Sequence, residues 1–455
     1  MVKRGALESR FDSNTYHPER IAVVERLRLT KWKLSALKFV AKFNKVLVSE
    51  NPDNLPYIGL ENIESNTGVY IPTEEREGFG TAVRFEKGKV LFPKLRPYLN
   101  KVYFSEFDGL CSTEFHILDS HVVDNQYLAY YLSSKFIVNQ TKWLMSGNTL
   151  PRLQTADIEN LLVPILPLEI QAQIVEKFNE AYEIKRQKET EARALLASID
   201  GYLLEQLGIK LPEKIETKPT FLTRFKDLQG KRFDPKNYLP QNQALYQILF
   251  QSKYDTKPLK SLTIQSVAGD WGIDEAKEGF SERLVIRATE FDNLHNLNLG
   301  NSRVKYRYVN DLKLSKMDLQ TGDLLIEKSG GSEDQPVGRI AIITEELAAS
   351  YRLAYSNFIH KIRINEEVNS AFLFYFLKTI HNIKITDTMQ SQTNGIRNLI
   401  MREFLNIPVS LPTLEVQIQI ADHISQIRAQ AKALETEARE VLATAKAEVE
   451  RVILG

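Results

Sequence analysis

Apolar residues recur at steps of three and four near the carboxyl end of the chain. From Val416 the pattern continues through Ile420, Ile424, Ile427, Ala431, Leu434, Ala438, Val441, Ala445, Val449 and Val452. A heptad pattern over about five repeats is typical of a coiled-coil helix. Such a helix of about 40 residues is about 60 Å long, more than a domain of about 150 residues can cover. We therefore expect it to pair with a second long helix.

That second helix is predicted in the middle of the chain. Its pattern is less regular: the apolar positions are Ile170, Ile174, Phe178, Ala192, Leu195, Ile199 and Tyr202, and the polar Gln206 follows at the same spacing. Proline fits a helix start and not its interior. The pairs Pro164/Pro167 and Pro408/Pro412 therefore mark where the two helices begin. The polar run 185–191 interrupts the first helix, and the alternative is that each helix packs on its own domain.

The segments before the two helices repeat each other. Matching segments are Arg10-Phe11-Asp12 with Arg232-Phe233-Asp234 (222 positions apart), Leu34–Leu37 with Leu259–Leu262 (225), Gly88–Phe92 with Gly322–Ile326 (234), Tyr127–Leu132 with Phe372–Leu377 (245) and Leu168–Ile174 with Leu414–Ile420 (246). The offset only grows, as expected for a duplicated unit whose second copy has longer loops.

Each copy has the same predicted order of elements. Strand-like runs come first, at 55–63, 89–92 and 114–118, and again at 283–291, 323–326 and 357–364. A short helix follows, at 125–136 and at 369–380. Turn signals of Gly, Pro and Asn bound these runs. The fold class is therefore α/β, with two globular segments and two long helices.

Composition adds exclusions. The 455 residues are 43% hydrophobic and 26% charged, which is ordinary for a globular protein of two or three domains. The single cysteine, Cys111, excludes a disulfide framework and a Cys-rich zinc site, and we expect it to be buried. The first residues have no signal-peptide core, and no apolar run approaches the 20 residues or so of a membrane span. We expect a cytoplasmic protein.

The charge is unevenly distributed. The net charge is +1, but residues 169–207 carry −3 and residues 415–455 carry −2, which leaves +6 for the rest. Basic residues cluster at Arg84, Lys87, Lys89, Lys94, Arg96 and Lys101, and at Arg303, Lys305, Arg307, Lys313 and Lys316. Such clusters suit a polyanion-binding surface, although most charge runs are simply solvated.

Catalytic motifs are absent from the sequence. It has no GxxxxGK[ST] phosphate loop and no HExxH helix, and its seven histidines lack metal-ligand spacing. Asp323 with Glu327 resembles a nuclease cluster, but the spacing is wrong and the repeat partner Lys89 is not acidic. We therefore predict no catalytic residue, no metal site and no cofactor in this chain.

Several stretches carry a resemblance to a known family. Gly88–Lys101 (GKVLFPKLRPYLNK) with Cys111–Phe115 (CSTEF), and Gly322–Gly331 (GDLLIEKSGG) with Asn406–Ile424, each precede a long helix. In this order they resemble the specificity subunits of Type I restriction-modification systems. One departure is that Leu166–Glu169, which leads into the first helix, is one residue shorter than Leu411–Glu415.

The resemblance implies two α/β target recognition domains, each reading half of a split site on double-stranded DNA, and two antiparallel helices that act as a spacer. It implies domains at 1–165 and at 209–410 (with a linker), and spacer helices at 166–208 and 411–455. It also implies partners: two methyltransferase subunits that use S-adenosylmethionine, and restriction motor and nuclease subunits that use ATP and magnesium. The alternatives are the recognition subunit of a two-sided cutter with a fused nuclease-methyltransferase, and a coiled-coil protein-interaction scaffold.

Two pairs of segments are candidates for DNA contact. Phosphates are bound by Lys, Arg and backbone N–H groups, and base edges by Arg, Lys, Asn, Gln or Ser. The turn Phe92–Lys101 and its counterpart loop Lys328–Ser332 form one pair, and 146–152 with 391–397 form the other. The candidate residues are Lys94, Arg96, Tyr98, Asn100, Lys101, Asn148, Arg152, Lys328, Ser329, Asn394 and Arg397. The plain alternative is that these are ordinary turns or helix caps.

Overall fold

The computed structural model describes residues 13–51, 53–72, 80–147, 149–213, 220–228, 233–300, 303–331, 336–393 and 396–454. The chain divides into two compact units: unit 1 comprises residues 1–190 and 434–455, and unit 2 comprises residues 191–433. Among the described residues, no helix combines the length and the apolar character that a membrane span needs. The matched tripeptide Arg10–Asp12 and residue Arg232 lie outside the described residues.

Unit 1 is built on two small sheets. The first is antiparallel in the order β2–β9–β6–β7, with strands Ala41–Asn44, Phe115–Ser120, Val90–Pro93 and Tyr103–Phe104. The second has the order β3–β5–β8–β4, with strands Val46–Val48, Ala82–Phe85, Gly109–Ser112 and Tyr57–Ile58, and its pair β4–β8 is parallel. Cys111, in β8, is fully buried, so this prediction is confirmed.

The described part of unit 1 also has four short helices. They are α1 (Pro18–Arg28), α2 (Asn125–Leu132), α3 (Lys135–Thr141) and α4 (Thr155–Glu159). Helix α2 packs against β6 and β9 and buries Tyr127, Leu128 and Leu132. A two-stranded sheet of β1 (Lys33–Ala36) and β10 (Leu162–Ile165) then leads into the first long helix.

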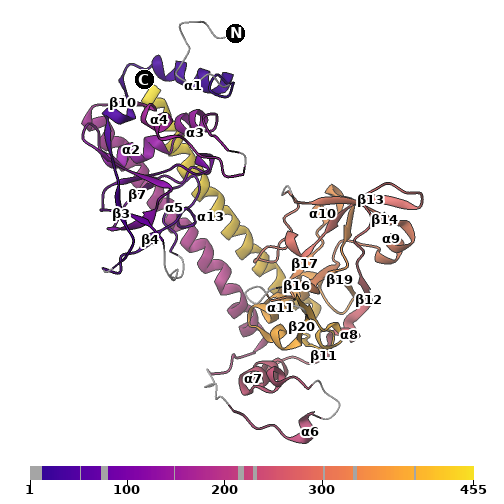
Figure 1. Ribbon diagram of the computed structural model, residues 1–455. Helices are drawn as coiled ribbons and strands as arrows, with labels where there is room; N and C mark the ends of the chain where they lie inside the picture. The colour runs from indigo at the N-terminus through magenta and orange to yellow at the C-terminus, as the bar shows by residue number, and fades with distance from the viewer. Residues whose placement is uncertain are drawn as a thin grey trace. The chain divides into compact units, whose positions relative to one another are not determined.

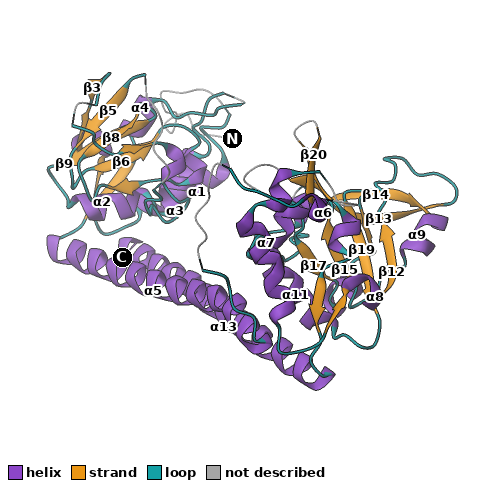
Figure 2. Ribbon diagram, turned by 90° about the horizontal axis from the view of Figure 1, so that it is seen from below, coloured by secondary structure: helices purple, strands orange, loops and turns teal. Residues whose placement is uncertain are grey.

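Unit 2 has three sheets and a further strand pair. The orders are β12–β19–β15–β17 (Thr263–Ala268, Ile359–Ile364, Leu324–Glu327, Ile340–Ile342), β14–β13–β18 (Lys305–Asn310, Phe280–Ile286, Leu353–Tyr355), β16–β21–β20 (Ser329–Gly331, Ile396–Leu399, Gln390–Thr393) and β11–β22 (Thr256–Pro258, Pro408–Ser410). The helices are α6 (Phe225–Leu228), α7 (Pro240–Gln247), α8 (Leu259–Leu262), α9 (Asp311–Met317), α10 (Glu345–Ser350), α11 (Ser370–Asn382) and α12 (Met401–Phe404). Figure 2 shows α11 alongside β15 and β17, and it packs against β17.

The two units share one sheet and differ in the other. The order β2–β9–β6–β7 of unit 1 has the same pattern as β12–β19–β15–β17 of unit 2. The second sheets share a parallel pair, β4 with β8 and β13 with β18. The strand added to this pair differs: β5 lies beside β8 in unit 1, whereas β14 lies beside β13 in unit 2. The two copies therefore diverged mainly around this second sheet.

The two long helices are α5 (Leu168–Leu207) and α13 (Leu414–Leu454), which confirms their prediction (Figure 1). In unit 1 the first half of α5 lies antiparallel to the second half of α13: Lys177 forms an ion pair with Glu448, and Lys188 forms one with Glu437 at 2.6 Å. In unit 2 the Tyr202 and His423 rings lie 4.4 Å apart, in the same antiparallel sense. The polar run at 185–191 is helical, and its Lys185 is 7% exposed.

The heptad pattern fails at one position. Val452 is 42% exposed, whereas Leu442, Val449 and Ile453 are buried in the core of unit 1. A straight α-helix drifts by about 20° per heptad relative to a 3.5-residue repeat, so a strict heptad does not track the buried stripe over several turns.

A buried glutamine fixes the start of each long helix. The Gln171 side chain accepts a hydrogen bond from the Asp124 N–H at 2.7 Å and donates to the Leu166 carbonyl at 2.7 Å. Gln417 does the same with the Asn369 N–H at 2.8 Å and the Pro412 carbonyl at 2.9 Å. Both glutamines are 1% exposed. These equivalent contacts support the duplication at the level of side chains.

One cross-strand ion pair is present in both units with reversed polarity. Lys89, next to β6, binds Asp119 of β9 at 2.7 Å in unit 1. In unit 2 the equivalent positions are Asp323, next to β15, and Arg363 of β19, which also lie 2.7 Å apart. Both sheets thus have opposite charges at this point, with the signs exchanged between the two strands.

Two details of the sequence comparison need correction. Leu37 donates its N–H to Leu161, and Leu259 donates its N–H to Ile407, so Leu37 corresponds to Leu259 and the 225-residue match of these segments is wrong. Pro164 and Pro408 lie in the strands β10 and β22 and not at helix starts. Both belong to two-stranded sheets, where proline without an N–H is tolerated.

Lys378 generates a prediction about stability. It is 5% exposed in α11, and burial lowers the pKa of its ammonium to about 8 from 10.5. Between pH 8 and pH 10.5 the unfolded chain therefore binds more protons than the folded chain. The free-energy cost of burying the charged ammonium is complete below pH 8 and is lost progressively as the pH rises to 10.5. We expect Lys378→Met to raise the free energy of unfolding of unit 2 at pH 7 by up to about 3 kcal/mol. Denaturant unfolding at pH 7 and pH 10 should show this gain shrinking at the higher pH; a loss at both would contradict the prediction.

Candidate nucleic-acid interface

In unit 1 the two segments expected to contact DNA lie side by side. The Lys94 N–H donates to the Glu114 carbonyl at 2.8 Å, and the Lys94 carbonyl accepts from the Leu153 N–H at 3.0 Å. The Arg96 N–H donates to the Pro151 carbonyl at 2.8 Å. The turn after β6 is therefore hydrogen-bonded to the segment 151–153, far from it in sequence.

Unit 2 repeats this backbone arrangement. The Lys328 N–H donates to the Phe358 carbonyl at 2.8 Å, and its carbonyl accepts from the Leu399 N–H at 2.8 Å. The prediction of a loop over Lys328–Ser332 is wrong for Ser329–Gly331, because these residues form strand β16 and pair with β21. Ser332 lies outside the described residues. Local sequence does not reveal this strand because its partner lies about 70 residues away, and pairing across a sheet decides strand formation.

Three side chains of the unit 1 turn are accessible to a ligand. Arg96 and Tyr98 are exposed, Tyr98 by 43%, and Lys94 is half-buried. Arg96 has φ 48°, in the left-handed region that non-glycine residues avoid. Its N–H bond to the Pro151 carbonyl holds it there, although a residue before proline favours extended backbone, so the turn presents the Arg96 side chain at a cost in backbone strain.

Two other predicted residues hold the turn in place. Asn100 is 5% exposed, and its amide donates to the Ser133 carbonyl at 2.8 Å. The Lys101 ammonium donates to the Leu60 carbonyl at 2.8 Å. Both polar groups are engaged inside the unit, which makes them positioning residues here.

Arg152 is bound to a neighbouring carboxylate. Its Nε lies 3.1 Å from Glu114 Oε2 and its Nη2 lies 2.9 Å from Glu114 Oε1. The hydrogen bond from Arg152 lowers the pKa of Glu114 below its usual value. Lys94 also acts electrostatically on Glu114, and both Arg152 and the exposed Lys45 act on Lys94, so three cations gather around one carboxylate. The net local charge is positive, as an anionic ligand requires.

The candidates of unit 2 are arranged differently. Lys328 and Arg397 are half-buried, with Arg397 on β21. Ser329 is 6% exposed, and its hydroxyl donates to Asn398 Oδ1 at 2.5 Å. Asn148 of unit 1 and Asn394 of unit 2 lie outside the described residues. A DNA-contacting role for all of these residues stays a prediction.

The structure adds a pair of histidines that the sequence analysis treated as dispersed. His116 of β9 and His360 of β19 occupy equivalent positions, and each is half-buried. Burial, with a contribution from Lys94 or Lys328, lowers the pKa of each imidazole to about 4. Both rings are therefore neutral near pH 7. The signal in the sequence is that His116 and His360 align with each other when the two copies of the repeat are compared.

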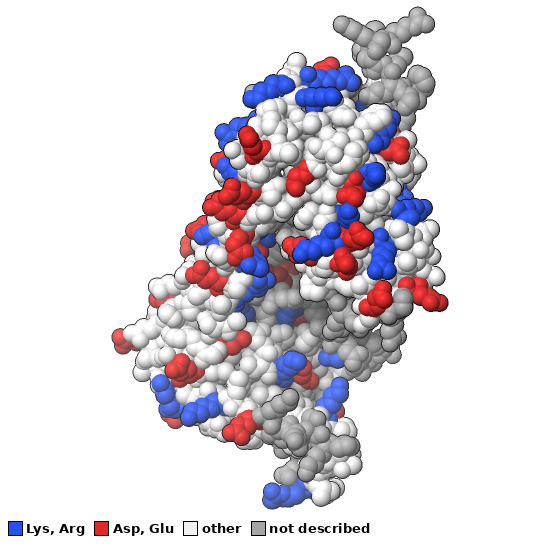
Figure 3. All heavy atoms as spheres, turned by 90° about the vertical axis from the view of Figure 1, so that its left-hand side faces the viewer, with Lys and Arg blue, Asp and Glu red and all other residues white. Residues whose placement is uncertain are grey.

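Surface charge alone does not outline this interface. Figure 3 shows Lys and Arg interspersed with Asp and Glu over the face drawn. Several cations of the two predicted basic clusters are paired: Arg84 with Asp53, Lys89 with Asp119, Arg307 with Asp274 and Lys313 with Asp270. The hydrogen-bonded geometry around Lys94 and Lys328 is therefore the better guide.

The suspected nuclease carboxylates are structural. Asp323 and Glu327 are each 1% exposed. Asp323 binds Arg363 at 2.7 Å, and Glu327 binds Arg339 at 2.8 Å. Within the described part of the chain, no group of three or more His, Cys, Asp or Glu residues is placed to hold a metal ion.

Comparison with known proteins identifies the family. The Type I restriction modification DNA specificity domain matches this chain over residues 31–194 and 285–444. The chain belongs to this family. The two matched segments of the specificity domain fall one in each copy, so the internal repeat is confirmed.

Individual relatives are distant. The Type I restriction enzyme EcoDI specificity subunit of Escherichia coli is 27% identical over 151 residues, which are 32% of this chain and 34% of that protein. The match thus spans about a third of the length of that curated relative. A solved structure described as "Structural basis underlying complex assembly and conformational transition of the type I R-M system" has a TM-score of 0.51 at 18% identity, over 93% of this chain and 96% of its own. The HsdS subunit from Thermoanaerobacter tengcongensis has a TM-score of 0.37 at 19% identity, over 93% and 95%. The structure with the TM-score of 0.51 supports the predicted fold of the specificity domains.

Arg96 allows strain and charge to be separated. Glycine adopts φ 48° freely, so we expect Arg96→Gly to keep or raise the free energy of unfolding, by up to about 1 kcal/mol. Arg96→Ala keeps the strain and should not stabilise. If Arg96 contacts a phosphate, both variants lose that contact and the salt slope of DNA binding falls by about one unit. Thermal unfolding and salt-dependent binding assays measure the two effects; a lower stability of Arg96→Gly than of Arg96→Ala would contradict the argument.

Proposed function

We propose that this chain is the DNA-recognition subunit of a Type I restriction-modification complex, and that each unit reads one half of a bipartite site. The supporting observation is the duplicated arrangement around Lys94 and Lys328, where equivalent backbone hydrogen bonds join two distant segments. A surface used twice for the same ligand retains its scaffold and changes its side chains. Membership of a DNA specificity family supports double-stranded DNA as the ligand.

The candidate residues then divide by role. We assign phosphate neutralisation to Lys94, Arg96, Lys328 and Arg397, because these cations are exposed or half-buried on or beside the joined segments. Tyr98 offers an exposed ring, and the amides of Asn148 and Asn394 suit adenine edges. Asn100, Lys101 and Ser329 support these segments from within, and Arg152 supports them through its ion pair with Glu114.

The chemistry belongs to partners. We assign methylation to two methyltransferase subunits that dock on α5 and α13 and use S-adenosylmethionine, and cleavage to restriction subunits that use ATP and magnesium. The chain itself supplies recognition, with target recognition domains at 1–165 and 209–410 and spacer helices at 166–208 and 411–455. A partner that fuses nuclease and methyltransferase is the alternative within this function; a protein-interaction scaffold is the alternative outside it.

The proposal is tested with half-sites. Methylome sequencing of cells that express the chain with its partners gives the motif, and duplexes are made with one or the other half scrambled. We expect Lys94→Ala/Arg96→Ala to weaken recognition of one half only, and Lys328→Ala/Arg397→Ala to weaken recognition of the other. Each double variant should lower the salt slope by about two units, one per phosphate contact.

Matched controls are available in each unit. Lys142 and Lys257 are cations outside the joined segments, paired with Glu19 and Glu367. Lys142→Ala and Lys257→Ala should leave both half-sites unaffected. Equal damage to both halves by either double variant contradicts separate readers, and sequence-indifferent DNA retention by the wild-type complex favours the scaffold.

The spacer function predicts a change in the motif. Tyr202 of α5 lies beside His423 of α13. In the same antiparallel register, the position after Arg193 lies level with the position after Ala431, and these are the two insertion points. One heptad inserted at both points preserves the seam phase and adds about 10 Å. At about 3.4 Å per base pair, we expect the gap between half-sites to lengthen by up to about three base pairs, with both half-sites unchanged. An active, lengthened complex that methylates the original motif would refute the spacer.

A further inference from the structure

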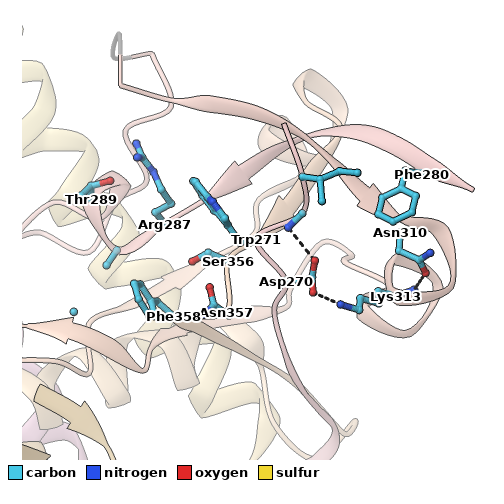
Figure 4. Close-up of a pocket in the computed structure, with 14 residues that line it drawn as sticks. Asp270, Trp271, Phe280, Arg287, Thr289, Asn310, Lys313, Ser356, Asn357 and Phe358 are labelled. Atoms are coloured by element: carbon cyan, nitrogen blue, oxygen red, sulfur yellow. Dashed lines mark hydrogen bonds and ion pairs between the residues drawn. The ribbon is translucent and has the colours of Figure 1, made fainter. Parts of the chain in front are cut away.

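Unit 2 contains a large pocket that the proposed function leaves unused. Its volume is about 990 Å³, and its walls come from the loop after β12, the end of β13, α9, β16 and the turn before β19. Three aromatic rings line it: Trp271, Phe280 and Phe358 (Figure 4). Ligand pockets of about 300–1,000 Å³ are of a size for small organic groups, and aromatic walls suit a planar one.

Trp271 is fixed in position before any ligand binds. The Arg307 guanidinium lies 4.5 Å from the centre of its ring, and Arg307 Nε donates to the Trp271 carbonyl at 2.8 Å. Gly272 follows with φ 69°, and a Cβ there would lie 2.5 Å from the Tyr308 carbonyl oxygen. The turn therefore requires glycine, and the indole is a preorganised stacking surface.

The charges around the pocket are already balanced. Arg287 pairs with Glu290 at 2.7 Å, while Lys313 pairs with Asp270 and Arg307 with Asp274. A phosphate or other anion would have to compete with these carboxylates. A neutral planar group gains stacking and cation–π contact without breaking an ion pair.

One wall offers an unused polar group. Ser356 is 2% exposed, and its hydroxyl has no hydrogen-bond partner among the described residues. Asn357 beside it is exposed on the same wall. A buried hydroxyl without a partner is costly, so a ligand that hydrogen-bonds there would be favoured. Nucleobases combine a neutral planar ring with hydrogen-bonding edges.

The pocket adjoins the proposed DNA interface. The carbonyl of Phe358 accepts from the N–H groups of Lys328 at 2.8 Å and Ser329 at 3.2 Å, and Gly330 of β16 lines the pocket. In unit 1 the position of Phe358 is taken by Glu114, which is bound to Arg152, and that of Arg287 by Gly59. Phe358 and Arg287 are thus particular to unit 2.

We propose that this pocket binds a neutral nucleobase, extruded from the DNA half-site that unit 2 reads. The proposal rests on the function proposed above. Trp271 and Phe358 would contact the ring faces, and Ser356 and Asn357 the edge. The same chemistry could be supplied by a free nucleoside, so the test separates these two sources.

The experiment uses the full chain in complex with its methyltransferase partners. Each base pair of the unit 2 half-site is replaced in turn by a mismatch that alters only one strand, and binding is measured against the intact motif. Opening a mismatched pair costs less, so we expect one position at which the mismatch tightens binding, by about tenfold. Trp271→Ala should abolish this gain and Trp271→Phe should retain part of it. Tyr306→Ala removes an exposed ring of β14 outside the pocket and should change nothing.

The possible outcomes are distinct. If no mismatch tightens binding while the complex still prefers its motif, the proposal of an extruded base is overturned. If the wild-type complex shows no preference for the motif, the proposed function itself is overturned. Adenosine or thymidine is also titrated against tryptophan fluorescence. Saturable quenching that disappears in Trp271→Ala, together with a mismatch scan in which no position tightens binding, supports a nucleobase ligand and assigns it to a free nucleoside. Release of a partner subunit by Trp271→Ala without DNA overturns the proposal in favour of a protein side chain.

Discussion

Each unit completes its hydrophobic core with half of a helix that belongs to the other copy in sequence. The core of unit 1 includes Leu442, Val449 and Ile453 of α13, and that of unit 2 includes Ile199 and Leu203 of α5. Burial of apolar surface is the main stabilising term, at about 25 cal/mol per Å². Neither copy can bury its apolar surface with its own residues alone. The rigid sheets that carry the candidate DNA-contacting turns therefore depend on antiparallel helix pairing.

On that shared support, the two units keep the backbone and vary the side chains. Lys94 and Lys328 have equivalent hydrogen-bonded neighbours, and each interacts electrostatically with an equivalent histidine, His116 or His360. Glu114, in contrast, corresponds to Phe358, which changes an ion pair into the wall of a pocket. Backbone bonds do not depend on side-chain identity, so a duplicated scaffold of this kind allows two surfaces to recognise different ligand sequences.

Much of this architecture was predictable because it follows from periodicity and repetition. The long helices followed from apolar spacing, and β6, β9, β15 and β19 overlap their predicted runs. The sequence could not predict features that depend on distant partners. Strand β16 exists because β21 pairs with it, and the left-handed Arg96 is held by Pro151. The position of Val452 was missed because heptads and straight helices differ in period. Three of the candidate residues, Asn100, Lys101 and Ser329, have their polar groups turned inward, which composition alone cannot indicate.

The reversed ion pair limits how such a chain can exchange parts. Lys89 faces Asp119 in one copy and Asp323 faces Arg363 in the other, at the same place in the sheet. A recombinant that joined the first strand of one copy to the second strand of the other would bring Lys89 against Arg363, or Asp323 against Asp119. Like charges directly opposite each other destabilise a sheet. A segment that the two copies exchange without this cost therefore carries both strands of the pair, β6 with β9 or β15 with β19, whereas a crossover between these strands separates the two charges.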